Sequence, residues 1–448
     1  MSRAPRNGAR ADRSERSARA NRADSSQPAA ALQPAAGPRT AFLVGLVLPG
    51  QPGYVVDEHL DELAELARSA GAAVAGRAVQ SRKARDPATY VGKGKAEEIA
   101  AAAKALGAGL LVFDDDLSGS QAKNLEEATG LAVMDRSALI LDLFDQRART
   151  REARTQVELA RLNYMMPRLT RRWSHLSRQA GGKGTRGGEG EKQLEQDRRV
   201  LRQRIRRLET DLEKIERTRD LHRRGRRAVP EIALTGYTND GKSTLFNRLT
   251  GAGALAEDRL FATLDAKLRR GVIGDGAMGW SAPSHAGPAG NEGDGSDGNV
   301  MDGNDGNGRD GGERSPGVAV FVDTVGFIRK LPHHLVSSFR STLGEIATAD
   351  LVLHVIDRSH GRWREQMEVA QAVLDELGVD RARVVEVFNK SDLVPADEPR
   401  NGDARDALWV SAATGDGVAA LRAALGKRFQ AASPARHATS DSADPARP

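Results

Sequence analysis

Residues 231–244, EIALTGYTNDGKST, decide the fold of this chain. Residues 232–234 form an apolar run that predicts a buried strand, and the apolar residues after Ser243 recur at helical spacing. Between the two, residues 236–243 fit the pattern G-x-x-x-x-G-K-S/T. A strand, a glycine loop and a helix in this order predict a phosphate-binding P-loop, because backbone N–H groups and the helix dipole then face the phosphate.

Two side chains of this loop have the chemistry that a nucleotide site needs. Lys242 would neutralise the β- and γ-phosphates, and the Ser243 hydroxyl would bind Mg²⁺. The competing interpretation is an ordinary glycine turn before an amphipathic helix, since short motifs also match by chance. Motifs further along the chain decide between the two.

Composition sets broad limits. A chain of 448 residues predicts two or three domains, and 39% hydrophobic residues are enough for their cores. The chain has no cysteine, which excludes disulfides and suits a reducing cytosol, so we expect a cytoplasmic protein. No apolar run reaches the roughly 18 residues of a membrane span, and we expect no stable membrane insertion. The 67 basic and 61 acidic residues hint only weakly at a polyanionic partner.

Three segments are expected to be disordered. Residues 1–40 are rich in arginine but nearly lack large apolar side chains, so a helix there would have no apolar face. That lack, together with several acidic residues, argues against a transit peptide and leaves a solubilising tail or an RNA-contacting arm. Residues 431–448 form a second tail, and the Gly-, Asp-, Asn- and Ser-rich residues 274–316 predict an insertion in a hairpin turn.

Residues 41–148 predict a small α/β domain with a parallel sheet, with strands at 41–48, 109–113 and 131–134. A loop at 90–95 places Lys93 and Lys95 among glycines, which suits phosphate, and both lysines are candidate RNA contacts. A second loop, residues 114–118, has three adjacent aspartates. They could hold a metal ion, but we favour a solvated helix cap, because neighbouring side chains of an extended chain point apart.

Residues 149–228 predict an arm of two antiparallel helices. Pro167 is expected to end the first helix, and the second is expected from about Gln193. The second carries a coiled-coil seam of leucines and isoleucines at 201, 205, 208, 212 and 215. The glycine-rich segment 178–192 joins the helices, and its Lys183 and Arg186 are expected to contact RNA phosphates. The alternative for this segment is a flexible connector.

Two further motifs complete a phosphate site. Residues 261–265, FATLD, place Thr263 in a loop before a strand at 269–273. Residues 323–326, DTVG, follow a strand at 318–322. Asp323 suits Mg²⁺, and the Gly326 amide suits the γ-phosphate.

Two more motifs predict selection of guanine. Residues 389–392, NKSD, follow a strand at 384–388, and residues 411–413, SAA, follow one at 408–410. Asp392 can accept hydrogen bonds from guanine N1 and N2 while Asn389 braces the loop, and a backbone N–H of 411–413 can reach guanine O6. Adenine presents an acceptor where guanine presents N1–H, so an aspartate favours guanine.

These motifs define the candidate site. Lys242, Thr263 and Gly326 are expected to act in catalysis. Ser243, Thr263 and Asp323 are expected to bind Mg²⁺. The residues expected to bind GTP are Gly236, Tyr237, Thr238, Asn239, Asp240, Gly241, Lys242, Ser243, Phe261, Ala262, Thr263, Leu264, Asp265, Asp323, Thr324, Val325, Gly326, Asn389, Lys390, Ser391, Asp392, Ser411, Ala412 and Ala413.

With these residues in hand, the chain resembles the HflX-type GTPases, the ribosome-associated branch of the translation-factor-related GTPases. The resemblance covers about residues 41–430. It rests on YVGKGKAEE (90–98), DDDLSGSQAKNLE (114–126), DRSALILDLFDQRARTREARTQVELARLNYMMPRL (135–169), GYTNDGKSTLFN (236–247), FATLD (261–265) and DTVGFIRKLPHHLV (323–336).

The resemblance implies an N-terminal α/β domain at 41–148, a helical linker at 149–228 and a Ras-like GTPase domain at 229–430. It also implies binding to the large ribosomal subunit and its RNA, and dissociation of stalled or idle ribosomes under stress. Members of the family have been linked to ATP use through the N-terminal domain, but this sequence has no second nucleotide motif that would establish it. We expect a monomer when the protein is free.

The sequence departs from the family pattern at several positions. Asp240 stands where a small residue is usual, and residues 266–269, AKLR, replace Pro-Thr-Thr-Arg. The glycine-rich tip is one residue longer, with Gly188 and Glu189 where one proline is typical. None of these changes removes a phosphate or base ligand. For Asp240, we expect the side chain to turn away and pair with a base such as Lys390 or Arg248.

We therefore expect a GTPase that couples GTP binding to the ribosome. Phe327 stands where many GTPases have a water-orienting glutamine, which predicts slow intrinsic hydrolysis that the ribosome accelerates. His333 and His334 are weaker candidates for positioning the water. Two rival hypotheses are a scaffold that binds nucleotide without hydrolysing it and an ATP-driven RNA-remodelling enzyme.

Overall fold

The computed structural model describes residues 39–172, 187–225, 229–251, 260–261, 266–274, 317–330, 340–395 and 408–432. The two expected tails lie almost wholly outside these ranges, as do the insertion from residue 275 on, residues 262–265, Lys183, Arg186, His333 and His334. No helix among the described residues combines the length and the apolar character that a membrane span needs.

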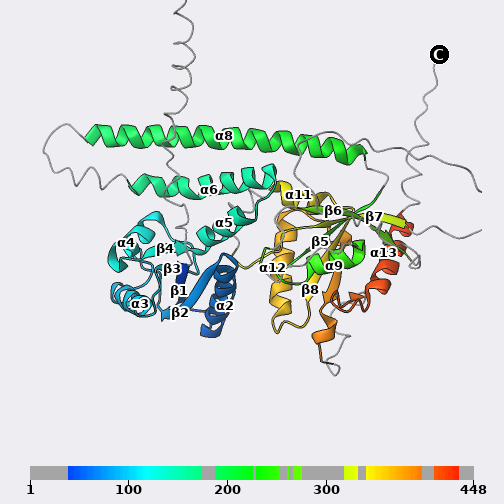
Figure 1. Cartoon of the computed structure of the whole chain (residues 1–448), viewed down its shortest axis with the longest axis horizontal. Helices are drawn as coiled ribbons and strands as arrows, with labels where there is room; N and C mark the ends of the chain where they lie inside the picture. Colours follow the sequence, from blue (N-terminus) through cyan, green and yellow to red (C-terminus); the bar gives the residue numbers. More distant parts are fainter. Residues whose placement is uncertain are drawn as a thin grey trace, which may run out of the picture. The chain divides into compact units, whose positions relative to one another are not determined.

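The N-terminal region is an α/β layer built on a four-stranded sheet (Figure 1). Its strands have the order β2-β1-β3-β4, and β3 pairs in parallel with both β1 and β4. The strands are β1 (Arg39–Val47), β2 (Ala72–Ser81), β3 (Leu110–Phe113) and β4 (Ala132–Asp135). The helices are α2 (Gly53–Ser69), α3 (Lys93–Ala105), α4 (Gly119–Thr129) and α5 (Arg136–Arg147).

Both faces of this sheet are covered by helices. Neighbouring residues of a strand point to opposite faces, so Leu43 packs in one buried cluster with α2 and α5. Phe42 and Val44 pack in another cluster with α3 and α4. The sequence analysis does not predict β2, whose alanine-rich residues are mostly half-buried and show no apolar run.

The arm consists of α6 (Arg151–Arg172) and α8 (Gly187–Gly225), which lie side by side in Figure 1. Leu159 of α6 packs against Ile205 and Leu208 of α8, in the seam that the sequence predicts. Arg204 fixes the register with two hydrogen bonds to Glu158, at 2.8 and 2.9 Å. The second helix begins at Gly187, six residues before the expected Gln193.

The prediction that Pro167 ends the first helix is wrong, because α6 continues to Arg172. A proline inside a helix costs about 3 kcal/mol through a lost hydrogen bond and a steric clash. Tertiary contacts just beyond the proline offset this cost. The Arg168 guanidinium bonds Asp135 at 2.6 Å and the Leu117 carbonyl at 2.7 Å, which anchors the last turns to the N-terminal layer.

The second sheet has six strands in the order β10-β9-β8-β5-β7-β6. All neighbouring pairs are parallel except β6 with β7. The strands are β5 (Glu231–Gly236), β6 (Lys267–Ile273), β7 (Gly317–Asp323), β8 (Leu351–Asp357), β9 (Val384–Asn389) and β10 (Leu408–Trp409). The helices are α9 (Lys242–Thr250), α11 (Arg340–Thr348), α12 (Trp363–Glu376) and α13 (Val418–Ala432).

Helices cover both faces of this sheet as well. Leu245 of α9 and Leu421 of α13 pack on one face, and Ile346 of α11 and Leu374 of α12 on the other. This is the doubly covered, mostly parallel α/β arrangement in which sites form at the carboxyl ends of the strands. The predicted α/β class with a P-loop GTPase domain is confirmed.

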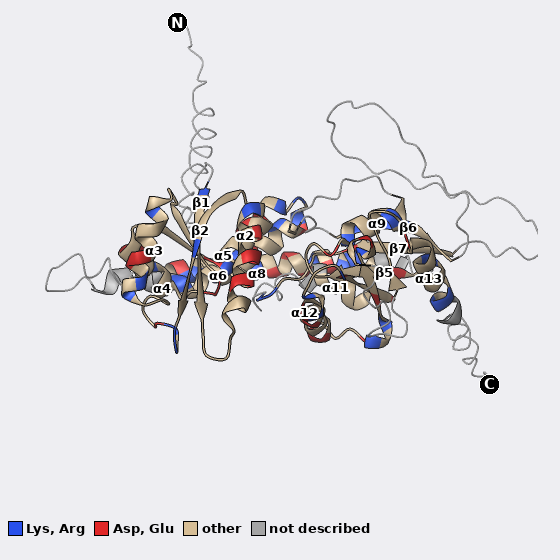
Figure 2. Ribbon diagram, turned by 90° about the horizontal axis from the view of Figure 1, so that it is seen from below, with Lys and Arg blue, Asp and Glu red and all other residues tan. Residues whose placement is uncertain are grey.

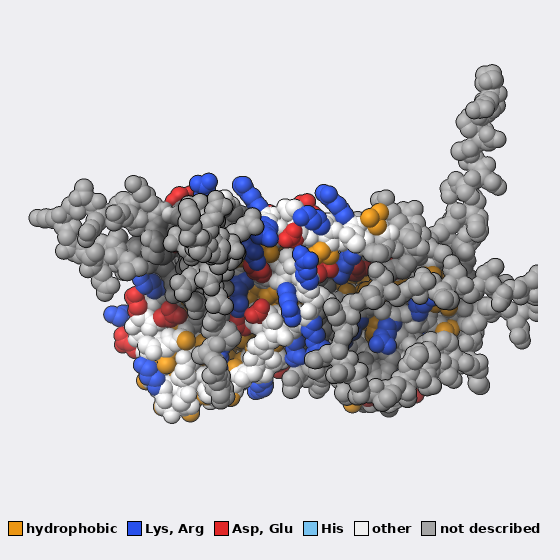
Figure 3. All heavy atoms as spheres, turned by 45° about the horizontal axis from the view of Figure 1, so that its top comes forward, with side chains coloured by type: hydrophobic (Ala, Val, Ile, Leu, Met, Phe, Trp, Pro, Cys, Tyr) orange, Lys and Arg blue, Asp and Glu red, His pale blue; other side chains and the backbone are white. Residues whose placement is uncertain are grey.

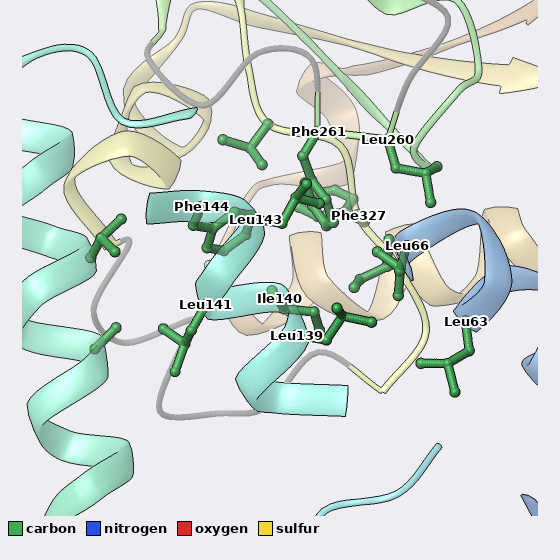
Figure 4. Packing of buried hydrophobic residues seen from close by; sticks show 14 of the residues in the cluster. Leu63, Leu66, Leu139, Ile140, Leu141, Leu143, Phe144, Leu260, Phe261 and Phe327 are labelled. Atoms are coloured by element: carbon green, nitrogen blue, oxygen red, sulfur yellow. The ribbon is translucent and has the colours of Figure 1, made fainter. Parts of the chain in front are cut away.

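A single buried cluster joins residues of the N-terminal layer to residues of the GTPase domain (Figure 4). Phe144 of α5 meets Phe261 edge to face, with ring centroids 4.8 Å apart. Phe327, which follows the D-x-x-G motif, lies in the same cluster and is 1% exposed. Phe261 and Phe327 therefore both pack in the cluster that includes α5.

Candidate active site

The P-loop lies between the carboxyl end of β5 and the start of α9, and two of its glycines cannot be replaced without strain. Gly236 has φ 146°, and a Cβ there would lie 2.1 Å from the Val355 carbonyl oxygen. Gly241 has φ 83°, and a Cβ there would lie 2.3 Å from Asn389 Nδ2. The loop therefore follows the backbone path that a phosphate cradle needs.

The D-x-x-G segment is tied to the P-loop by backbone hydrogen bonds. Phe327 N donates to the Gly236 oxygen at 2.9 Å, and Thr238 N donates to the Phe327 oxygen at 2.7 Å. A Cβ on Gly326 would lie 2.8 Å from Lys242 Nζ, so the lysine ammonium lies against Gly326. In this structure Lys242 Nζ donates to the Tyr237 carbonyl.

Ser243 and Asp323 come together as the sequence predicts. The Ser243 hydroxyl donates to Asp323 Oδ2 at 2.8 Å, and Asp323 is fully buried at the end of β7. Hydroxyl and carboxylate oxygens are the ligands that Mg²⁺ prefers, so this pair fits the ion. Thr263, the third expected ligand, lies outside the described residues, with Ala262, Leu264 and Asp265.

The base-binding loops are braced by Asn389. Its Nδ2 donates to the Asp240 carbonyl at 2.8 Å, and its Oδ1 accepts from Ala412 N at 2.9 Å. One side chain thus connects the P-loop with both predicted guanine loops. Asp392 is exposed at the end of this site, where a base can reach it, whereas Ser411 is buried.

The Asp240 side chain is buried within the loop, and only 3% of it is exposed. Burial raises its pKa to about 7, against the opposing effect of Lys242. Lys390, a partner that we expect, is among its charged neighbours, but Arg248 instead bonds the Ala412 and Ala413 carbonyls. Asp240 therefore turns inward, into the cradle.

His354 on β8 is a second buried titratable group near the loop. It is 1% exposed, and neither ring nitrogen has a hydrogen-bond partner among the described residues. Burial, and then the charge of Lys242, lower its pKa to about 4, so it is neutral at physiological pH.

The sequence analysis missed a set of contacts between the P-loop and the N-terminal layer. The Tyr237 hydroxyl donates to Glu62 of α2 and accepts from Arg329 N at 2.9 Å. Glu62 also accepts from Arg136, which donates to Asp114 at 2.8 Å. No local pattern reveals this chain of contacts, because Tyr237 and Glu62 are 175 residues apart in sequence.

The three adjacent aspartates do not form the solvated cap that we favoured. Asp114 is buried and pairs with Lys330 and Arg136, and Lys330 Nζ also lies 2.6 Å from Asp115. Burial opposes ionisation of Asp114, but His59, Arg136 and Lys330 together hold its pKa well below its usual value. The helix cap is Ser118, and among the described residues no three His, Asp or Glu side chains come together as metal ligands.

The glycine-lysine loop at 90–95 is partly helical, since α3 begins at Lys93. Lys93 is exposed, and Lys95 pairs with Glu98 at 2.5 Å. Both remain candidates for RNA contact.

A cleft of about 470 Å³ opens beside the P-loop. Tyr237 and Asp240 line one side, and Glu58, Glu62 and Glu65 of α2 line the other. Figure 2 shows the acidic residues as red segments on α2. Arg329 and Arg362 line the same cleft, so its charge is mixed.

Three family models match the chain, one for each expected region. They are described as the GTP-binding GTPase N-terminal region (residues 57–145), the GTP-binding GTPase middle region (147–226) and a 50S ribosome-binding GTPase (231–390). The GTPase HflX of Magnetococcus marinus is 41% identical over 398 residues, which cover 87% of this chain and 83% of that protein. The chain belongs to the HflX GTPase family.

A second relative supports the assignment to the HflX family. The GTPase HflX of Escherichia coli K12 is 43% identical over 378 residues, covering 83% of this chain and 79% of that protein. As a member of the HflX family, this chain is a GTP hydrolase. Among solved structures, a GTP-binding protein from Sulfolobus solfataricus in complex with GDP is 22% identical with a TM-score of 0.41, covering 89% of this chain and 99% of that one.

Proposed function

We propose that this GTPase binds the large ribosomal subunit and dissociates stalled or idle ribosomes under stress. The observation that carries the proposal is the match of residues 231–390 to a family described as a 50S ribosome-binding GTPase. The arm and the N-terminal layer, which match the other two family regions, are the parts available to contact ribosomal RNA.

We infer that Mg²⁺ is the cofactor, held by Ser243 and Asp323 and completed by Thr263. The hydrogen-bonded Ser243 and Asp323 oxygens support this. When bound, the ion supplies positive charge to the phosphate oxygens. Lys242 and the Gly326 amide are assigned to the γ-phosphate, and the close approach of Lys242 Nζ to Gly326 supports this.

Selection of guanine is assigned to Asp392 and the loop at 411–413. Asn389 supports the assignment, because it holds this loop and the P-loop in one arrangement. Asp392 accepts two hydrogen bonds from guanine, whereas adenine leaves it opposite an acceptor. We therefore expect GTP to compete far better than ATP.

Contact with ribosomal RNA is assigned to Lys93, Lys95, Lys183 and Arg186. Lys93 is exposed at the start of α3, where phosphate is favoured, which supports its assignment. Lys95 is half-buried and pairs with Glu98, so its assignment rests on the sequence. The protein works in the cytoplasm, and as a monomer when free.

Co-sedimentation with purified ribosomal subunits tests the proposal directly. We expect the protein to sediment with the large subunit in the presence of a GTP analogue, and less in GDP or ATP. Sedimentation that is absent in all three states, or equal with both subunits, would overturn ribosome binding as the function.

A further inference from the structure

Asp240 is an unusual residue to find inside a phosphate cradle. Its carboxyl is 3% exposed, and Oδ2 lies 3.0 Å from where a Cβ on Gly236 would stand. Its backbone carbonyl accepts a hydrogen bond from Asn389, which ties this part of the loop to the end of β9. The carboxyl is therefore buried in the same loop that would bind the phosphate.

Four charged groups share this part of the loop in the nucleotide-free structure. Asp240 faces Lys242 at the start of α9, Asp357 at the end of β8, and Lys390 just after β9. Asp357 and Lys390 are paired at 2.7 Å. Two carboxylates and two ammonium groups thus give this part of the loop no net charge. Lys242 is the main cation that acts on Asp240.

The remaining titratable groups nearby act on Lys242 rather than on Asp240. Asp323 at the end of β7 raises the pKa of Lys242, whereas burial lowers it. His354, on β8 below the loop, is neutral. The cleft that Asp240 lines also holds His360, Arg329 and Arg362, with Glu58, Asp61, Glu62 and Glu65 of α2. Arg362 pairs with Glu58 and Arg329 with Glu365, so Lys242 remains the main cation that acts on Asp240.

Binding of a nucleotide changes the charges around Asp240. Lys242 turns its charge to the phosphates, which bring several negative charges of their own into the loop. Asp240 then loses its main cation and gains anionic neighbours, and both changes favour the neutral carboxylic acid.

We propose that Asp240 takes up a proton when the site binds GDP or GTP, so that nucleotide affinity falls as pH rises. The bound state holds the proton more tightly than the free state, so affinity is constant below the free-state pKa. Above that value each nucleotide must recruit a proton, and affinity declines until the bound-state pKa is passed. Burial already raises the free-state pKa to about 7, which places the effect in the physiological range.

Calorimetric titration of the full chain with GDP and Mg²⁺ tests the proposal, in two buffers of different ionisation enthalpy. The wild type should take up about half a proton more than Asp240→Asn near pH 7.5. Between pH 6 and pH 8, its affinity should fall about three- to tenfold relative to that variant. Protonation of GDP and of its Mg²⁺ complex contributes equally to the experiments with both proteins. It therefore cancels when the two proteins are compared.

Asp357→Asn provides a second test that leaves Asp240 in place. Asp357 raises the pKa of Asp240, so its removal should move the midpoint of the affinity profile to lower pH. Equal proton uptake by wild type and Asp240→Asn, with parallel pH profiles, would overturn the proposal. An unmoved midpoint in Asp357→Asn would overturn it as well, even if Asp240→Asn failed to fold.

Discussion

The Asp240 carboxyl affects folding as well as nucleotide binding. Its pKa is about 7 in the folded protein and about 3.9 in an unfolded chain. Between these values the folded state binds more protons, so stability falls as pH rises from about 4 to about 7. This one buried acid therefore contributes less stability at neutral pH than in mild acid.

Asp240→Asn, which keeps the shape without the charge, should be more stable than wild type at pH 8, by about 1–4 kcal/mol. At pH 5 the difference should be smaller, because only the first part of the loss between about pH 4 and about pH 7 has then occurred. Thermal unfolding at both pH values measures this. Glu368→Gln, on the exposed side of α12, is the control and should show no such pH dependence. An Asp240→Asn effect of equal size at both pH values would contradict the account.

Phe327 stands at the water-orienting position of many GTPases, yet its side chain points into the cluster with Phe144 and Phe261 (Figure 4). Phe327→Gln should therefore fail to speed hydrolysis by more than about threefold. It should lower stability by about 1–3 kcal/mol, because a polar amide enters an apolar cluster. Single-turnover GTP hydrolysis and thermal unfolding check the two parts. A rate gain of a hundredfold would mean that the side chain reaches the nucleotide.

Along α8, the arginines are distributed unevenly. Residues 198–207 contain six arginines and no acid, whereas residues 209–219 alternate acids and bases. Arg199 and Arg206 lie opposite the apolar seam, and no carboxylate pairs with them within the described part of the chain. Figure 3 shows Lys and Arg side chains, with acidic side chains between them, on the face of the molecule turned forward from the top of Figure 1. Like charges three or four residues apart destabilise a helix. A bound polyanion would neutralise these arginines and relieve their repulsion.

Replacing Arg199 and Arg206 with glutamine should weaken binding to purified large subunits about tenfold and reduce the salt slope by about 1.5. The double variant should be no less stable than wild type, because repulsion along α8 is relieved. The matched control replaces Lys214 and Arg217, which pair with acids on the same helix, and should bind nearly as wild type. If the two double variants lose affinity equally, the effect is one of net charge and not of this face.

The sequence predicts those helices and strands whose own residues show a clear local pattern. The P-loop strand and helix, the seam of α8 and the strands before each nucleotide motif follow from apolar spacing and glycines. Pro167 shows the limit, because contacts of Arg168 with Asp135 and Leu117 override a local helix breaker. The apolar run at 351–357 is enough to predict β8 from the sequence, whereas β2 has no such run.

At the scale of the whole molecule, Arg136 is the buried centre of the contacts that reach the P-loop. It is 1% exposed and pairs with both Glu62 and Asp114, and Glu62 receives the Tyr237 hydroxyl. These contacts could not be predicted from the sequence, because the partners are far apart along the chain and meet only when the chain packs. The motifs located the nucleotide ligands but not the residues that connect them to the N-terminal layer.

Arg136→Leu should lower the free energy of unfolding at pH 7 by about 3–5 kcal/mol, since Glu62 loses its buried cation and Asp114 keeps Lys330 alone. Asp114 has a lowered pKa in the folded state, so its ion pairs stabilise the wild type above about pH 4 and are lost as pH falls further. The deficit of the variant should therefore shrink in strong acid. Urea unfolding at pH 7 and at about pH 2.5 measures it.

Arg381→Leu is the matched control for this prediction. Arg381 pairs with Asp375 at 2.7 Å, but both side chains are about half exposed or more. Exposed pairs contribute about 1 kcal/mol or less, so this variant should unfold nearly as wild type. Equal losses for the two arginines would contradict the buried role of Arg136.

The central claim is a GTPase whose hydrolysis depends on the ribosome, and the rate of GTP hydrolysis with and without purified large subunits tests it most directly. The isolated protein should turn over slowly, and large subunits should accelerate it at least about tenfold, with excess ATP unable to inhibit. Fast hydrolysis by the isolated protein that large subunits leave unchanged would contradict the account.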